Sequence, residues 1–134
     1  LFICPGLFNE ARQVIVFFAK LLRHGLIPNL HDRGNNTRYN ARDATWFFIQ
    51  SIKDYIEISQ DLDFLNLEVE LFFKSDDQHQ HYQKQHEQRP KKTISEIIYT
   101  IFATHAKGIR FREWNAGSKI DDCMTDQGFN VEIR

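Results

Sequence analysis

An arginine, an aspartate and a tryptophan stand close together before and within a predicted helix: Arg42, Asp43 and Trp46. A guanidinium and a carboxylate suit the hydroxyls of a sugar, because one donates several N–H bonds and the other accepts at two oxygens. An indole supplies a flat apolar surface on which a pyranose ring can pack. The types and spacing therefore indicate a sugar-binding site. In the structural alternative, which is compatible with the first, Asp43 caps the helix and Arg42 extends into solvent.

A second polar and aromatic cluster follows near the C-terminal end of the sequence. It comprises Arg112, Glu113, Trp114 and Asn115. One interpretation is a second wall of the same binding cleft. The other is a solvated run of charges with one buried tryptophan. Two such clusters in one short chain favour a binding site more strongly than either does alone.

Carboxyl groups are the next candidates, because hydrolysis of a glycosidic bond requires two of them at a set separation. One acts as an acid, and the other acts as a base or a nucleophile. The sequence gives no distances, so the pairing stays open. The candidates are Asp43, Glu113, Asp121, Asp122 and Asp126.

Other chemistries find little support. His79, His81 and His86 lie in a polar segment, and their spacing completes no known metal site, so a solvated loop is favoured. The remaining histidines are not accompanied by a Gly-x-Ser-x-Gly nucleophile motif. Phosphate-binding loops and dinucleotide-binding fingerprints are also absent from the sequence. We expect neither a metal nor a cofactor.

Two helices are expected to position the first cluster. One begins at Asn9, a favourable N-cap residue, and ends before Gly25, a typical C′ residue. The second begins near Asn40, which forms a capping-box-like pair with Asp43, and continues to about Ser59. Arg42 and Asp43 would then lie in its first turn.

A third helix is predicted from Thr93, with Glu96 completing a capping box, to Gly108. Residues 60–74 alternate partly like a strand, although a helical fold would make them a loop or a short helix. Residues 75–92 are polar and of low complexity, which predicts a solvated loop, with disorder as the alternative.

Composition limits the class of protein. The chain has 134 residues, of which 42% are hydrophobic and 13% aromatic, so it can form one small domain with a core. Its net charge of -1 gives no electrostatic footprint for nucleic acid. No apolar run reaches the ~20 residues of a membrane span, and no signal-peptide pattern is present. Cys4 and Cys123 suggest a reducing compartment, so we expect a cytoplasmic location and neither nucleic-acid nor membrane partners.

Several long strings of the sequence resemble a known family. They include Leu-Arg-His-Gly-Leu-Ile-Pro-Asn-Leu, Arg-Tyr-Asn-Ala-Arg-Asp-Ala-Thr-Trp and Gly-Ile-Arg-Phe-Arg-Glu-Trp-Asn-Ala-Gly. The chain is similar to the amylo-α-1,6-glucosidase domain of glycogen debranching enzymes, most closely over residues 9–56 and 107–130. Residues 60–92 match poorly, apart from Ser-Asp-Asp at 75–77.

The resemblance implies an all-α fold, a partial (α/α)6 barrel, with residues 1–134 as a single partial domain. It also implies hydrolysis, with inversion, of the α-1,6-linked glucose left at a glycogen branch point, and hence glycogen or limit dextrin as partner. Arg42 and Asp43 would bind the glucose. The wider set of implied substrate-binding residues adds Trp46, Arg112, Glu113 and Asn115.

The chain stops before the segments that would supply the general acid and the general base, which are expected beyond Arg134. The catalytic residues are therefore unknown, and we expect this fragment to be inactive in isolation. The first alternative is a non-catalytic carbohydrate-binding remnant of the domain. A helical interaction domain with charged surface clusters is the other.

Overall fold

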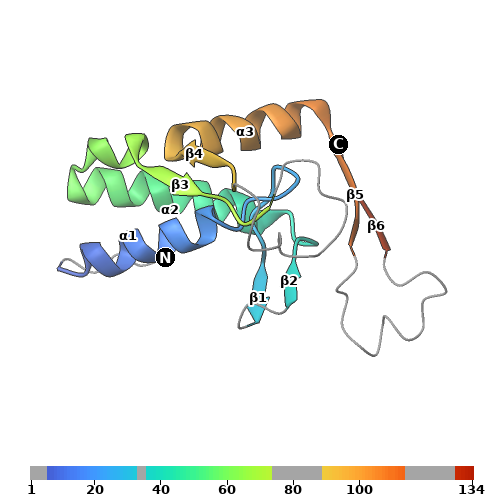
Figure 1. Cartoon of the computed structure of the whole chain (residues 1–134), viewed down its shortest axis with the longest axis horizontal. Helices are drawn as coiled ribbons and strands as arrows, with labels where there is room; N and C mark the ends of the chain where they lie inside the picture. Colours follow the sequence, from blue (N-terminus) through green and yellow to red (C-terminus); the bar gives the residue numbers. More distant parts are fainter. Residues whose placement is uncertain (1–5, 33–35, 74–88, 114–128) are drawn as a thin grey trace.

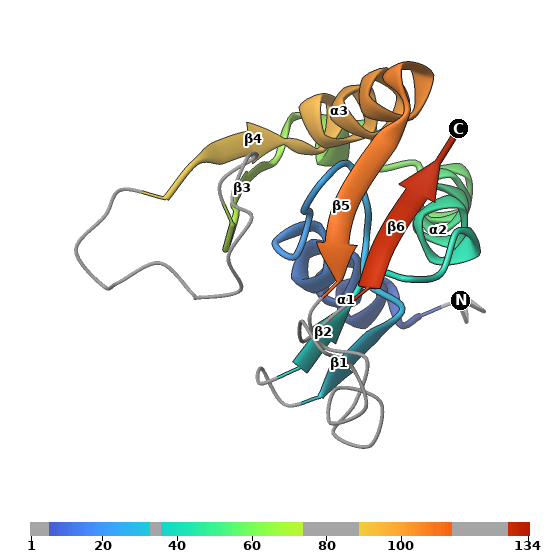
Figure 2. The ribbon, with the colours of Figure 1, turned by 90° about the vertical axis from the view of Figure 1, so that its right-hand side faces the viewer.

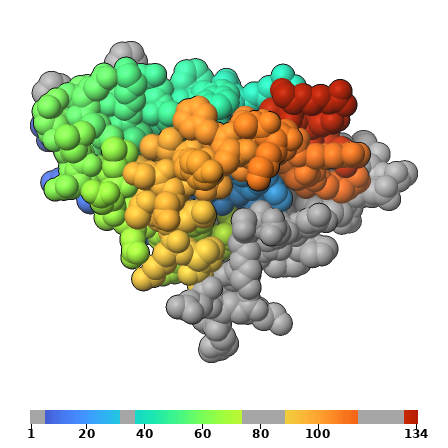
Figure 3. Space-filling model, turned by 90° about the horizontal axis from the view of Figure 1, so that it is seen from above, coloured from blue at the N-terminus to red at the C-terminus, as the bar shows by residue number. Residues whose placement is uncertain are grey.

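Three helices lie alongside one another in the computed structural model, which describes residues 6–32, 36–73, 89–113 and 129–134. The C-terminal ends of the first and third helices and the N-terminal end of the second lie at one end of the group (Figure 1). Viewed from above, the third helix lies beside the second along one face (Figure 3). The helices are α1 (Phe8–Ala19), α2 (Asp43–Ser59) and α3 (Ile94–Lys107).

The start of α3 follows its sequence signal closely. The hydroxyl of Thr93 accepts a hydrogen bond from the N–H of Glu96 at 3.2 Å, and the N–H of Thr93 donates to the Glu96 carboxylate at 2.7 Å. Each of the two side chains thus accepts a hydrogen bond from a backbone N–H that the helix itself leaves unpaired. Gly108, with φ of 83°, forms the C-cap. The predicted capping box and the predicted end of this helix are both confirmed.

The predicted caps of α1 and α2 are wrong. Asn9 lies inside α1, which has Leu7 at its N-cap and ends at Ala19, well before Gly25. Helix α2 has Arg42 at its N-cap position, and no side chain caps it. Packing of apolar side chains therefore sets these helix starts, whereas local capping chemistry sets the start of α3.

Short antiparallel strand pairs occupy the segments between and after the helices. The first and the last of these pairs along the chain lie at the same end of the helix group as the start of α2 (Figures 1 and 2). A 3₁₀ helix, Leu62–Asn66, precedes the third pair. The pairs are β1 (Leu30–Asp32) with β2 (Asn36–Arg38), β3 (Glu68–Glu70) with β4 (Lys91–Thr93), and β5 (Ile109–Glu113) with β6 (Phe129–Ile133).

The prediction of an all-α fold, a partial (α/α)6 barrel, is therefore wrong. The described chain is a mixed α/β fragment with three helices and three small antiparallel sheets. Apolar and charged residues alternate along Ile109–Glu113, which is the period of a strand. This segment forms a strand, as its local pattern indicates, and not part of a helix. Lys91 and Lys92, at the end of the predicted polar loop, belong to β4. Residues 75–88 of that loop lie outside the described part.

Two groups of buried residues form the core. The larger lies between the helices and includes Ile15, Ile52 and Ile101, each at most 2% exposed. The smaller joins Tyr39 to Ile109, and so packs the segment before α2 against β5. No helix within the described residues is both long enough and apolar enough to span a membrane.

Candidate functional site

The start of α2 carries two charged side chains that are exposed to solvent. The side chains of Arg42 and Asp43 are exposed, and neither caps the helix. Within the described residues, no hydrogen bond or ion pair engages either of them. A carboxylate in the first turn is stabilised there by the free N–H groups of the helix. Both groups therefore stay available to a ligand.

Asp43 lines a pocket of about 320 Å³ between α1 and α2. This volume falls within the ~300–1,000 Å³ typical of small-molecule sites. Asn29 and Ser51 add polar groups, and Phe47, which is 66% exposed, adds a large apolar surface. The remaining lining residues are Val14, Ile15, Phe18, Ile27, Pro28, Ala44 and Phe48.

Trp46 lies elsewhere on the same helix. Its ring packs toward α3, with ring centroids 4.7 Å from His105 and 5.8 Å from Phe102, and it does not line the pocket of Asp43. Phe47 is the exposed aromatic residue beside Asp43, and it is not among the site residues predicted from the sequence. The signal was the spacing: residues i and i+4 are neighbours on a helix surface.

The backbone around Arg42 and Asp43 is fixed on both sides. The buried Tyr39 donates its N–H to Oε2 of Glu113 at 2.7 Å and its hydroxyl to the carbonyl of Leu21 at 2.6 Å. The fully buried hydroxyl of Thr45 accepts a hydrogen bond from the N–H of Ile27 at 3.0 Å. Neither Tyr39 nor Thr45 was a candidate from the sequence, because both act through burial and long-range contacts.

The second predicted cluster lies on β5. Glu113 is 2% exposed, and its bond to Tyr39 joins residues 74 positions apart. Arg112 is partly exposed and donates a hydrogen bond to Oδ1 of Asn130 on β6 at 3.4 Å. The structure thus connects the two clusters through Tyr39 and Glu113. Trp114 and Asn115 lie outside the described residues.

Several of the remaining candidates lie outside the part of the chain that the structure describes. Asp121, Asp122 and Asp126 lie outside the described residues, as do the histidines at 79, 81 and 86. In the part of the chain that the structure describes, no group of three or more His, Cys, Asp or Glu side chains could hold a metal ion. Asp43 is the one carboxylate among the described residues lining its pocket.

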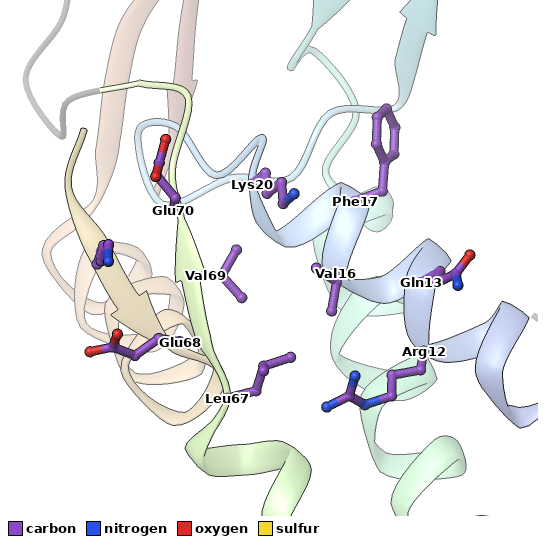
Figure 4. A pocket seen from close by; sticks show the side chains of 10 residues that line it. Arg12, Gln13, Val16, Phe17, Lys20, Leu67, Glu68, Val69 and Glu70 are labelled. Atoms are coloured by element: carbon purple, nitrogen blue, oxygen red, sulfur yellow. The ribbon is translucent and has the colours of Figure 1, made fainter. Parts of the chain in front are cut away.

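A larger pocket, of about 610 Å³, opens between α1 and β3 (Figure 4). Leu67 and Val69 point toward Val16, whereas Glu68 and Glu70 point away (Figure 4). Two of its charges already have partners: Arg12 lies 3.8 Å from Asp61, and Glu70 lies 3.6 Å from Arg89. Of the predicted sugar-binding residues that the structure describes, none lines this pocket.

Comparison with known proteins defines the family to which this chain belongs. Residues 1–133 match a family model described as amylo-alpha-1,6-glucosidase, and the chain belongs to that family of glycosidase-related domains. It is 51% identical over 129 residues to the glycogen debranching enzyme of Saccharomyces cerevisiae. The match covers 96% of this chain and 8% of the yeast protein, so the chain spans a small part of that relative. The family indicated by the sequence strings is thereby confirmed.

Proposed function

We propose that this chain is part of a glycoside hydrolase that removes α-1,6-linked branch-point glucose from glycogen limit dextrin. Membership of the amylo-alpha-1,6-glucosidase family and the name of the yeast relative support this class of substrate. The observation that carries the proposal is structural. Arg42 and Asp43 stand exposed at the start of α2, and Asp43 lines a pocket that also contains an exposed aromatic ring.

Each group has a role that its chemistry allows. Asp43 accepts hydrogen bonds from glucose hydroxyls, Arg42 donates to a hydroxyl oxygen, and Phe47 packs on the apolar face of the sugar ring. Trp46, Arg112 and Asn115 belong to the wider site that a branched glucan would contact. A carboxylic acid protonates the glycosidic oxygen and a carboxylate activates water on the opposite face, and we assign neither role within this chain.

A second function is favoured by one observation. Among the described residues of this pocket, only Asp43 carries a carboxyl group, whereas glycoside hydrolysis requires two. A non-catalytic site that holds α-glucan satisfies the same geometry. Binding and hydrolysis therefore have to be measured separately.

The test is the substitution Asp43→Asn in the native protein that contains this sequence. We expect release of glucose from limit dextrin, measured as kcat/KM, to fall by about 100-fold, because a charge-assisted acceptor for the sugar is lost. Asp54→Asn is the matched control: this aspartate lies on the same helix, where it accepts a hydrogen bond from Gln50 at 2.6 Å. The control is expected to retain wild-type activity.

Binding of limit dextrin to the same variants, measured by affinity electrophoresis, separates the two functions. Loss of both binding and glucose release with Asp43→Asn supports the hydrolase. Loss of binding in a protein that releases no glucose even as wild type supports the non-catalytic site. Unchanged binding and unchanged glucose release would contradict both.

A further inference from the structure

Glu113 is a buried carboxylate whose role the sequence did not reveal. It ends strand β5, where alternate residues share one face with the buried Ile109. A buried charge is costly unless hydrogen bonds compensate for the lost water. Here the carboxylate accepts the Tyr39 N–H at 2.7 Å, a short bond of the charge-assisted kind. At 2% exposure, the Glu113 side chain is withdrawn from any ligand in solution.

The group that Glu113 holds lies directly before the exposed charges. Tyr39 is 2% exposed, and its ring is further fixed by the hydroxyl bond to the Leu21 carbonyl. Four residues later the chain reaches Asp43, and two residues beyond that Thr45 is bonded to Ile27. Arg42 and Asp43 therefore sit on a short segment anchored at both ends, and Glu113 is the one charged anchor among these contacts.

We infer that Glu113 is a positioning residue: it fixes the backbone that presents Arg42 and Asp43, and it acts on the sugar only through them. This inference rests on the proposed function for its effect on a glucan, but its structural part can be tested alone. A site must hold its groups to within a fraction of an ångström to bind well, and buried neighbours supply that order. Glu113 of the second cluster thus holds Arg42 and Asp43 of the first cluster in position.

Glu113→Gln is the variant that tests this role. Glutamine keeps the shape and a carbonyl acceptor for the Tyr39 N–H, but it loses the charge and brings two new donors into a buried site. We expect faster hydrogen exchange, by about tenfold, in peptides covering residues 39–46 of the native protein. Peptides from the middle of α3 should be unchanged. The matched control is Glu132→Gln, because Glu132 is an exposed residue on the neighbouring strand β6, paired with Arg134 at 2.8 Å.

A double-mutant cycle with Asp43→Asn tests the link to the sugar. If Glu113 acts through the segment that carries Arg42 and Asp43, Glu113→Gln alone lowers kcat/KM on limit dextrin by about tenfold, and the further loss that it adds to Asp43→Asn is clearly smaller than tenfold. If Glu113 contacts the sugar itself, the two losses multiply, and the positioning role is overturned.

The outcomes distinguish this inference from the proposed function. Unchanged exchange in residues 39–46 with Glu113→Gln overturns the positioning role, even when Asp43→Asn abolishes glucose release. Faster exchange there, with wild-type binding and activity in Asp43→Asn, keeps the positioning role and overturns the proposed function. A thermal melt of each variant detects global unfolding, and exchange confined to the segment excludes it as the cause.

Discussion

The two clusters of charged and aromatic residues look alike in the sequence, but the structure uses them in opposite ways. At the start of α2, Arg42 and Asp43 face solvent, and no described residue pairs with them. On β5, Glu113 is buried and bonded to a backbone N–H of the segment before α2. The carboxylate of Asp43 is exposed to solvent, whereas the carboxylate of Glu113 holds the backbone of the segment before α2.

The secondary structure explains the difference. Residues in the first turn of a helix lie at its open end, so their side chains can reach solvent even when the rest of the helix is packed. In a strand, alternate residues face opposite sides, and Glu113 falls on the same side as Ile109 while Arg110 and Arg112 fall on the other. The composition of a charge run therefore does not decide its role; the period of the element that carries it does.

The largest expected effect comes from a glycine that supports the first cluster. Gly25 has φ of +73° in the turn between Arg23 and Leu26, next to the Ile27 N–H that bonds Thr45. A Cβ at this position would lie 2.5 Å from Cβ of Thr104. We expect Gly25→Ala to destabilise the protein by about 2–5 kcal/mol, from left-handed strain together with overpacking. Chemical denaturation followed by fluorescence measures the change.

Gly108 provides the matched comparison before the second cluster. It has φ of +83°, but among the described residues its added Cβ would meet only the carbonyl oxygen of Ile133 at 3.4 Å, an ordinary contact. Gly108 has ψ of 146°, a conformation that is nearly confined to glycine, so Gly108→Ala should cost only the conformational strain, about 1–3 kcal/mol. Equal losses for the two substitutions would contradict the view that close packing against α3 fixes the Gly25 turn.

The second prediction separates the two carboxylates by their effects on stability. Glu113→Ala leaves the buried Tyr39 N–H without its acceptor, so we expect a loss of about 1–3 kcal/mol in the free energy of unfolding. Asp43→Ala removes an exposed charge from a first helical turn and should cost at most about 1 kcal/mol. Denaturant titration of both variants gives the comparison. A larger stability loss for Asp43→Ala than for Glu113→Ala would contradict the view that Glu113, and not Asp43, stabilises the fold.

The sequence predicted those features of the fold whose chemistry is local. The α3 capping box needs only Thr93 and Glu96, which are three residues apart, and it is confirmed. The predicted N-cap of α1, Asn9, is wrong by two residues, because Phe8 packs against the core and the helix begins there without a capping side chain. The fold class was wrong because it followed the family resemblance instead of the alternation in Ile109–Glu113.

The charged residues of the candidate site could be predicted from the sequence, but the buried contacts that hold them in place could not. Arg42 and Asp43 were identified because adjacent opposite charges at a helix start are visible in the sequence. The burial of Glu113 and its bond to Tyr39 depend on contacts across 74 positions, which no local pattern reports. The nearby aromatic residue was predicted as Trp46, and the structure places Phe47 in the pocket instead. Whether these residues bind a sugar remains a prediction.

The starts of α2 and α3 extend the comparison to the use of acidic side chains at helix ends. In α3, the N–H and the hydroxyl of Thr93 bond with Glu96, so that carboxylate serves the helix. In α2, the first-turn carboxylate of Asp43 makes no cap bond. An acid that serves a cap is therefore not free to bind a ligand, whereas an acid that leaves its helix uncapped is.

The last and smallest expected effect is a titration that sharpens this contrast. The Thr93 backbone N–H, followed by its hydroxyl, holds the pKa of Glu96 below the ordinary value of 4.5. A carboxyl pKa that folding lowers contributes stability at pH values above its unfolded pKa, and this contribution is lost as the pH falls through the folded pKa. We expect carbon NMR to give a lower midpoint for Glu96 in the protein than in a peptide of residues 91–98. Thr93→Ala removes the hydroxyl but keeps the N–H, so its midpoint should lie between the two. A midpoint in Thr93→Ala equal to that of the unsubstituted protein would show that the hydroxyl does not lower the pKa of Glu96.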